Sequence, residues 1–520
     1  MNTASLLLGQ VSVRPDAPAL IETIGGRDQV LTFADLDEQS GRVAALLHQK
    51  GLHSGQTALV FVPMSLDLYI VLVALFRLGV VAMFLDPSAG TAHIRACCAL
   101  HAPDAFIGTV KAHLLRLVSP ALRRIPLKIS VGGVPVPGAT RQTDSGRRTP
   151  FTMIVPAVEN TPALMTFTSG STGQPKAAVR THGLLAAQHR SLAASLHLQP
   201  GEIDLTTLPI FALANLASGV TSVIPTGDLR RPGAVNVPPI RAQILRLRPT
   251  RAAASPAFFE RLLESGEPLP SLRHIYTGGA PVFPGLLDSL TMATEPEAEI
   301  VAVYGSTEAE PIAHIARAEM SDNDISAMGS GKGLLAGLPV PDIALGILPD
   351  AWGTPLGPFT PDAFDDLCLP ADQPGEIVVS GDHVLPGYLN GQGDAETKFR
   401  VGNTIWHRTG DEGYLDDTGR LWLLGRCGAR IEDDRGILYP FAVECAARRD
   451  PAVRRVAVVS HKNRRLLLVE GGNIDTNALR TALHWAILDE VRVWDTLPVD
   501  KRHNAKIDYP ALHHRLDRER

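Results

Sequence analysis

The segment from Met165 to Lys176 is the part of the sequence whose residue types most directly indicate a chemical role. An apolar stretch typical of a buried strand runs into small, hydroxyl-bearing and glycine residues, and then into Pro175 and Lys176. Glycines let backbone amides approach an anion closely, hydroxyls add donors, and the lysine adds a mobile positive charge. It is not a strand–GxxxxGK[ST] phosphate loop, because Gln174 rather than lysine follows Gly173. The expected ligand is therefore a polyphosphate, contacted by Thr168, Ser169, Gly170, Ser171, Thr172, Gly173 and Lys176.

The elements that must position this segment alternate in type along the first four hundred residues. Short apolar stretches bounded by Gly, Pro or charged residues alternate with helical patterns, which is typical of an α/β fold with mostly parallel strands. The expected helices include Phe33–Gln49, Leu66–Leu78, Leu184–Leu196 and Ile240–Leu247. The expected strands include Ala58–Val62, Val80–Leu85, Ala105–Gly108, Ala163–Thr168, His274–Tyr276 and Ile300–Val303.

The pattern changes near Gly375, where short strands with turn signals begin to dominate. We predict a large N-terminal domain, residues 1–425, with parallel sheets flanked by helices and a small β-rich subdomain. A small α+β C-terminal domain, residues 426–520, should follow, since a chain of 520 residues exceeds one hydrophobic core. The stretch Leu348–Pro374, rich in Pro, Gly and Asp, is interpreted as a long surface loop or insertion.

Composition excludes several classes of protein. The net charge of −5 and the lack of a basic stripe argue against a nucleic-acid binder. Five cysteines without CxxC spacing indicate neither a zinc site nor a disulfide framework, so a reducing, cytoplasmic location is expected. The start of the sequence shows no signal-peptide pattern. Arg77 lies within the most apolar stretch, so we expect a buried helix and no membrane span.

Several short motifs occur downstream of the segment described first. They are Gly278-Gly279-Ala280, Tyr304-Gly305-Ser306-Thr307-Glu308, Thr409-Gly410-Asp411, Leu424-Gly425-Arg426 and Asn504-Ala505-Lys506. Together and in this order, they resemble the adenylate-forming superfamily of acyl-CoA synthetases, luciferases and peptide-synthetase adenylation domains. The resemblance covers nearly the whole chain and implies an ATP-dependent, AMP-forming enzyme that activates a carboxylic acid.

The resemblance implies a role for each of these motifs. Gly278, Gly279, Ala280, Tyr304 and Gly305 would surround the adenine, and Asp411 would bind the ribose hydroxyls. Thr307 would lie near the α-phosphate, Glu308 would bind Mg²⁺, and Arg426 would contact phosphate or ribose at a hinge. Lys506, on a mobile C-terminal domain, would neutralise charge at the reacting phosphorus. Catalysis would be positioning plus charge neutralisation, with ATP and Mg²⁺ as the required cofactors.

The fate of the acyl-adenylate separates the branches of this superfamily. Acyl-CoA ligases usually carry an aromatic–His pair in the pocket region, where this chain has Phe211-Ala212. They also usually carry an acidic or lysine residue just after the Gly-Arg of the hinge, where this chain has Cys427. The segments Phe211–Leu213, Gly419–Trp422 and Arg502–Ile507 are similar to the β-lactone synthetases of bacterial long-chain olefin biosynthesis. In that branch the 3-hydroxyl of a 2-alkyl-3-hydroxy fatty acid attacks its own activated carbonyl, and no CoA is needed.

Two alternatives stay open. The first is a fatty-acyl–CoA or acyl–carrier-protein ligase, which would need CoA or a carrier protein. The second is a catalytically silent nucleotide-binding homologue, which the retained Lys176, Glu308, Asp411, Arg426 and Lys506 disfavour. The expected partners are a small carboxylic acid and neighbouring enzymes of a lipid pathway; the identity of the acid and the oligomeric state are not predicted.

Overall fold

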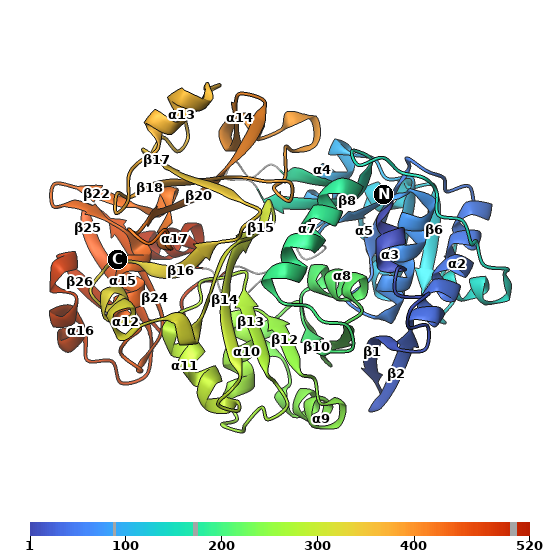
Figure 1. The fold of residues 1–520 in the computed structure, drawn as a ribbon, viewed down its shortest axis with the longest axis horizontal. Coiled ribbons are helices and arrows are strands. Elements are labelled where there is room, and N and C mark those ends of the chain that lie inside the picture. Colours follow the sequence, from blue (N-terminus) through green and yellow to red (C-terminus); the bar gives the residue numbers. More distant parts are fainter. Residues whose placement is uncertain (87–89, 170–174, 500–506, 520) are drawn as a thin grey trace. The chain divides into compact units, whose positions relative to one another are not determined.

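The computed structural model describes residues 1–86, 90–169, 175–499 and 507–519 (Figure 1). The chain divides into two compact units, each described by itself below. Unit 1 comprises Met1–Thr226 and Asp382–Ala395, and unit 2 comprises Gly227–Gly381 and Glu396–Arg520. The predicted boundary after residue 425 lies inside unit 2 and stays a prediction. In the described part of the chain, no helix is both long and apolar enough to cross a bilayer.

Unit 1 contains a sheet that is parallel except at one edge, where β8 and β9 are antiparallel. Its strand order is β7 (Thr140–Arg141), β6 (Leu127–Val131), β5 (Ala105–Thr109), β3 (Thr57–Phe61), β4 (Val81–Phe84), β8 (Pro162–Ser169) and β9 (Pro175–Thr181). A second group of strands in the same unit has the order β10 (Ile203–Thr206), β11 (Thr221–Ile224), β1 (Pro18–Ile24) and β2 (Arg27–Thr32). The mostly parallel α/β pattern predicted for this part of the chain is confirmed.

The helices of unit 1 follow their local sequence signals. Helix α3 (Leu66–Leu78) begins after Ser65, whose hydroxyl accepts a hydrogen bond from the amide of Leu68, and ends at Gly79 with a φ of 68°. Arg77 in this apolar helix is buried and donates to the carbonyls of Phe151 (3.1 Å) and Thr152 (3.2 Å). The apolar side chains of α3 are thus buried within the protein, as predicted, and its arginine has protein partners. The remaining helices are α1 (Thr3–Leu7), α2 (Phe33–Gln49), α4 (Gly90–Leu100), α5 (Val110–Val118), α6 (Pro120–Arg124), α7 (His182–Ser195) and α8 (Pro209–Ser218).

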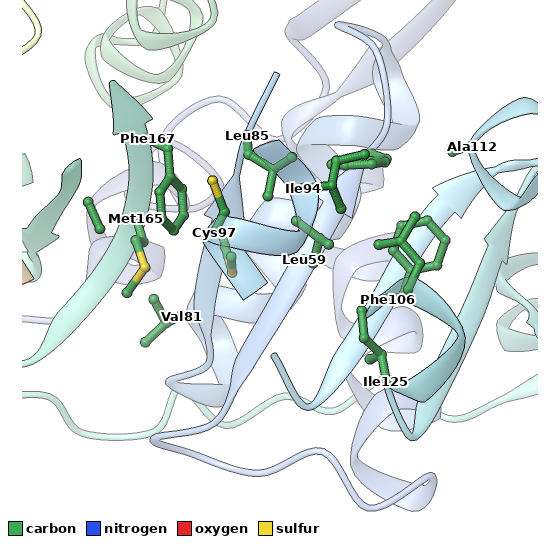
Figure 2. Packing of buried hydrophobic residues seen from close by; sticks show 14 residues of the cluster. Leu59, Val81, Leu85, Ile94, Cys97, Phe106, Ala112, Ile125, Met165 and Phe167 are labelled. Carbon is green, nitrogen blue, oxygen red and sulfur yellow. The ribbon is translucent and has the colours of Figure 1, made fainter. Parts of the chain in front are cut away.

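The core of unit 1 lies between its parallel strands and the helices α4 to α6. Figure 2 shows side chains from β3, β5 and β8 converging with those of α4 on this core, among them Leu59, Phe106, Met165 and Cys97. Phe61 and Phe106 meet edge to face with ring centroids 5.5 Å apart. Met165 and Phe167 belong to the strand that leads into the glycine- and hydroxyl-rich segment, so that segment starts from a rigid, buried base.

Unit 2 contains a parallel group of strands that continues into an antiparallel group. The parallel group is β12 (Arg251–Ala254), β13 (His274–Gly278) and β14 (Glu299–Ser306). The antiparallel group continues from β14 in the order β15 (Ala309–Ala316), β16 (Leu334–Pro339), β21 (Leu421–Arg426), β20 (Thr404–Leu415), β18 (Gly375–Ser380) and β17 (Ala344–Leu348), with β19 (Lys398–Val401) beside β20. The helices between these strands include α9 (Val237–Leu247), α10 (Pro256–Leu263), α11 (Pro284–Ala293), α12 (Asp322–Gly329) and α13 (Pro361–Leu367).

The C-terminal part of unit 2 has hydrophobic clusters of its own. The antiparallel pair β24 (Val453–His461) and β25 (Arg464–Gly471) is extended by β26 (Glu490–Val493) and packs against α15 (Pro440–Ala447) on one face. Its other face buries Leu512 and Leu516 of α17 (Tyr509–Arg518). The α+β character predicted for the chain after residue 425 is confirmed. The stretch 348–374, expected to be loop, contains the short helix α13, whose Phe364 is buried against Trp406.

Candidate active site

The phosphate-binding segment predicted from the sequence is the connection of the β8–β9 hairpin in unit 1. The two strands pair so that Thr168 lies opposite Lys176 and Ser169 lies opposite Pro175. The intervening Gly170, Ser171, Thr172 and Gly173 lie outside the described residues, as do the side chains of Thr168 and Ser169. The hairpin therefore brings the two ends of the predicted segment together.

Lys176 is only 7% exposed, which the sequence pattern did not indicate. Its Nζ lies 5.8 Å from the centroid of the Tyr388 ring, within the range of a cation–π contact. Gly393 has a φ of 101°, and a Cβ there would come within 2.6–2.7 Å of the end of the Lys176 side chain, which would have to move. Tyr388 and Gly393 belong to the segment of unit 1 that is distant in sequence, and no motif marked them. The side chain of Lys176 therefore lies against this distant segment.

Unit 2 contains a cavity of about 380 Å³ that collects most of the remaining predicted residues. Gly279, Ala280, Tyr304, Gly305, Asp411 and Arg426 all line it. Gly278 does not line the cavity but supports it, since a Cβ there would lie 2.5 Å from the carbonyl oxygen of Val303. Apolar residues of β16 and β21, including Leu335 and Leu423, complete this side of the wall. A flat apolar group with a polar edge, such as a purine, fits such a slot.

A hydrogen-bonded cluster centred on Asp411 forms the polar wall of the cavity. Tyr304 Oη donates to Asp411 Oδ2 (2.8 Å), and Arg426 Nη1 donates to Asp411 Oδ1 (2.9 Å). Asp411 and Arg426 are direct cross-strand partners on β20 and β21. Burial and the adjacent Asp411 carboxylate raise the pKa of Tyr304, and the same carboxylate raises the pKa of Arg426. Each carboxylate oxygen has a second lone pair, so Asp411 can still accept hydrogen bonds from two hydroxyls of a ligand.

Thr307 and Glu308 occupy the tight turn between β14 and β15, next to the cavity-lining Ser306. Ser306 Oγ accepts hydrogen bonds from the amides of Glu308 and Ala309, both at 3.3 Å, which fixes the turn. Over the residues that the structure describes, no three His, Cys, Asp or Glu side chains form a ready-made metal site. Mg²⁺ typically uses one or two carboxylates together with substrate phosphates, so the single carboxylate of Glu308 is compatible with that ion.

Behind the cavity, β20 is anchored by a buried ion pair. Arg408 donates from Nε (2.7 Å) and Nη2 (2.6 Å) to the two carboxylate oxygens of Glu376, and neither side chain is exposed. The guanidinium of Arg408 lies 5.4 Å from the ring centroid of Trp352. The same Trp352 ring lies against Gly410, the residue before Asp411. Trp352 of the 348–374 stretch therefore lies against the backbone next to Asp411, a contact that its composition did not reveal.

The far wall of the cavity comes from the C-terminal part of unit 2. Tyr509 Oη donates to Glu444 Oε1 (3.1 Å), and burial raises the pKa of Glu444 to about 8. Ile507 and Tyr509 line the cavity, whereas Lys506 lies outside the described residues. The chain that follows Lys506 is thus fixed in the cavity wall. Glu444 was missed because its only sequence signal is a single carboxylate in the apolar helix α15.

Comparison with known proteins shows relatives across the whole chain. The family model for AMP-binding enzymes matches residues 8–389. An olefin beta-lactone synthetase of Stenotrophomonas maltophilia is 32% identical, covering 93% of this chain and 91% of its own. One from Xanthomonas campestris pv. campestris is also 32% identical, covering 98% of this chain and 96% of its own.

The fold has solved counterparts. The amide bond synthetase McbA from Marinactinospora thermotolerans superimposes with a TM-score of 0.80 at 20% identity, covering 98% of this chain and 99% of that one. At this identity, the likeness shows the fold alone. The family match extends over most of the chain and includes the β8–β9 hairpin and the Tyr304 turn. The chain therefore belongs to the AMP-binding enzyme family and is an ATP-dependent, AMP-forming enzyme that activates an acid.

Proposed function

We propose that this enzyme activates a 3-hydroxy fatty acid as its acyl-adenylate and then closes the acid to a β-lactone with release of AMP. The observation that carries the proposal is the match, over nearly the entire chain, to two proteins named olefin beta-lactone synthetases. The match that covers 98% of this chain extends over both the nucleotide-binding motifs and Lys506.

The described residues support a division of labour in nucleotide binding. The cavity of unit 2 takes the adenine beside Gly279 and Tyr304, and Asp411 accepts hydrogen bonds from the ribose hydroxyls. Lys176 and the segment that precedes it bind the triphosphate, with Thr307 near the α-phosphate. Glu308 would hold Mg²⁺, which supplies neutralisation of phosphate charge.

The proposed reaction has two balanced steps. A carboxylate oxygen of the acid attacks the α-phosphorus of ATP, and the bond to pyrophosphate breaks. The 3-hydroxyl oxygen of the same acid then attacks the acyl carbon, the bond to AMP breaks, and the hydroxyl proton passes to solvent. Lys506 neutralises charge in the first step. In the second step the nucleophile is already held near the carbonyl, which gives a large entropic advantage over an external nucleophile.

Two local features support lactone closure over transfer to CoA. Ala212 is fully buried in α8 at the position where CoA ligases usually carry a histidine. Cys427 follows Arg426 in a short 3₁₀ turn, Cys427–Ala429, instead of the acidic or lysine residue usual in ligases. A reaction with an intramolecular nucleophile needs neither the histidine nor the acidic or lysine residue of the CoA ligases.

Product analysis tests the proposal. The enzyme is incubated with ATP, Mg²⁺ and a panel of fatty acids and 2-alkyl-3-hydroxy fatty acids, with and without CoA. We expect β-lactone from the hydroxy acids in the absence of CoA, with equal amounts of AMP. Formation of thioester only when CoA is present would contradict lactone closure and favour the ligase alternative.

Substitution of the lysine predicted to be catalytic tests the first step. Lys506→Ala should lower acid-dependent exchange of labelled pyrophosphate into ATP by at least about 100-fold, because charge at the reacting phosphorus is no longer neutralised. The matched control is Lys462→Ala, which removes an exposed lysine from the β24–β25 turn in the same part of unit 2. Near-normal exchange in Lys506→Ala would show that another group performs this role.

A further inference from the structure

Helix α5 of unit 1 exposes an apolar stripe that has no role in the proposed function. Leu114, Leu117 and Val118 are 58%, 74% and 64% exposed. Their spacing of three and four residues places them on one face of the helix. Isolated exposed aliphatic residues are common on proteins, but three on one face of a nine-residue helix form a patch.

The opposite faces of α5 and its neighbour α6 explain why this helix is stable without burying the stripe. Leu122 of α6 belongs to the core of unit 1. So do Ala112 of α5 and Ile125 (Figure 2). Thr109 caps the start of α5 by accepting a hydrogen bond from the amide of Ala112 (3.4 Å). The stripe is therefore a surface that the fold holds outward and does not use for packing.

The same part of the chain is strongly basic. Residues 105–143, which lie between Asp104 and Asp144, contain six Lys or Arg and no Asp or Glu, although the whole chain has a net charge of −5. One of the six, Arg141, pairs with Asp144 (2.9 Å), which leaves five without a neighbouring carboxylate in sequence. The six are Lys111, Arg116, Arg123, Arg124, Lys128 and Arg141. Lys111, Arg123 and Arg124 are exposed. A local excess of positive charge on an acidic protein indicates attraction to an anionic surface.

Hydrogen bonds bring the basic and apolar groups together. Arg123 Nη1 donates to the carbonyls of Arg116 (3.1 Å) and Leu117 (2.8 Å) at the end of α5. Lys111 lies on the same helical face as Leu114 and Val118, three and seven residues before them. Arg116 Nη1 donates to the carbonyl of Pro137 (3.3 Å) and so connects the loop of residues 132–139 to α5. This loop carries the exposed Val134.

We propose that this basic–apolar patch, formed by α5 with Arg123 and Arg124 of α6, docks the enzyme reversibly onto a lipid bilayer that carries anionic headgroups. The aliphatic side chains enter the boundary between headgroups and acyl chains, and the basic side chains contact the phosphates. A helix of nine residues is far too short to span a bilayer, so the contact is peripheral. The patch fits a membrane better than a nucleic acid, since aliphatic rather than aromatic side chains accompany the positive charge.

Vesicle co-sedimentation of the full-length enzyme tests the proposal. Vesicles of phosphatidylcholine alone are compared with vesicles that also contain phosphatidylglycerol, at low and high salt. We expect binding only to the anionic vesicles, weakened by salt because exposed charges are screened. Binding that is absent, or equal on neutral and anionic vesicles, would overturn the proposal.

Two variants separate the apolar and the electrostatic contributions. Leu114→Gln/Leu117→Gln/Val118→Gln and, separately, Lys111→Glu/Arg124→Glu should each lower the vesicle partition coefficient by at least about tenfold. The matched controls are Met292→Gln, an exposed apolar residue of unit 2, and Lys50→Glu/Arg190→Glu, which reverses two exposed charges elsewhere in unit 1. The controls should bind as the unaltered enzyme does.

Pyrophosphate exchange with a water-soluble acid shows whether each variant is folded, because the patch is separate from the residues assigned to the reaction. Unchanged exchange combined with lost vesicle binding supports the proposal. Variants that bind vesicles normally overturn it. Variants that bind vesicles normally but change the oligomeric state overturn it in favour of a protein partner at this surface.

Discussion

Strand β20 carries two arginine–carboxylate pairs whose surroundings are opposite. Asp411 pairs with Arg426, whose side chain is 58% exposed at the cavity, whereas Arg408 pairs with Glu376 where neither side chain meets solvent. Both pairs use the same chemistry and lie only three residues apart along the strand. The pair at the cavity can still accept hydrogen bonds from a ligand and donate to it. The buried pair is out of reach of a ligand and stabilises the strand. Burial rather than residue type thus separates the pair that a ligand can still reach from the pair that it cannot.

The largest expected effect on stability comes from breaking the buried pair. Arg408→Met leaves Glu376 in an apolar environment without its partner, and should lower the free energy of unfolding by about 3–5 kcal/mol. Urea denaturation followed by tryptophan fluorescence measures the change, because Trp352 lies over Arg408. Arg426→Met is the matched control and should change stability by less than about 1 kcal/mol. Equal losses in the two variants would show that the contrast between the pairs is not one of burial.

The exposed pair should dominate ligand binding instead. Asp411→Ala removes the acceptor proposed for the ribose hydroxyls and releases Tyr304 and Arg426. We expect the Kd for ATP to rise by about 30- to 100-fold, equivalent to about 2–3 kcal/mol, with little change in unfolding. Isothermal titration calorimetry measures the affinity directly. An unchanged Kd would remove Asp411 from the nucleotide site and leave its cluster a structural one.

The connection between the two pairs is Gly410, which has a φ of 71°. A Cβ at this position would lie 2.8 Å from the ring of Trp352, so Gly410→Ala should destabilise the protein by about 1–2 kcal/mol. It should also weaken ATP binding, because Asp411 is displaced. Gly419→Ala isolates the backbone strain, since Gly419 has a φ of 78° but no neighbouring atom would lie within 4 Å of a Cβ added there. Equal ATP affinity in the two variants would contradict a positioning role for Trp352.

Local signals are sufficient where a structure depends on neighbours in sequence. The boundaries of α3 follow from Ser65, an unbroken apolar stretch and Gly79, and the structure confirms them at Leu66 and Leu78. The motif residues that line the cavity are likewise recognisable, because each motif follows directly after a strand or lies within one. Their roles in binding remain predictions.

Contacts between distant segments cannot be derived in this way. Tyr388 lies over Lys176 from more than two hundred residues away, and Tyr509 meets Glu444 across 65 residues. Trp352 lies in a loop, as the surrounding Pro, Gly and Asp residues predict, but composition does not indicate that its ring packs on Arg408. Such contacts depend on how the sheet topology brings distant segments together and not on hydrophobic periodicity, so no local sequence pattern predicts them.

The effect that depends on pH concerns Glu412, which follows Asp411 on β20 and, like Arg408, has a buried side chain. Its Oε1 accepts a hydrogen bond from Arg430 Nη1 (2.8 Å), and its Oε2 is buried with no hydrogen-bond partner in the described part of the structure. Burial raises the pKa of Glu412 to about 7, from the usual value near 4.5. Between about pH 4.5 and pH 7, the folded state therefore holds a proton on Glu412 that the unfolded chain has lost.

The sign of the pH dependence follows from this difference in bound protons. Between about pH 4.5 and pH 7, the folded state binds more protons than the unfolded state, so this group's contribution makes stability fall as the pH rises. Glu412→Gln should remove that fall, about 3 kcal/mol in all, measured by urea denaturation across this range. Glu432→Gln is the matched control, because Glu432 also pairs with Arg430 but is 67% exposed. If both variants keep the pH slope of the unaltered enzyme, Glu412 is ionised in the fold, and the buried face of β20 tolerates charge as readily as the cavity face does.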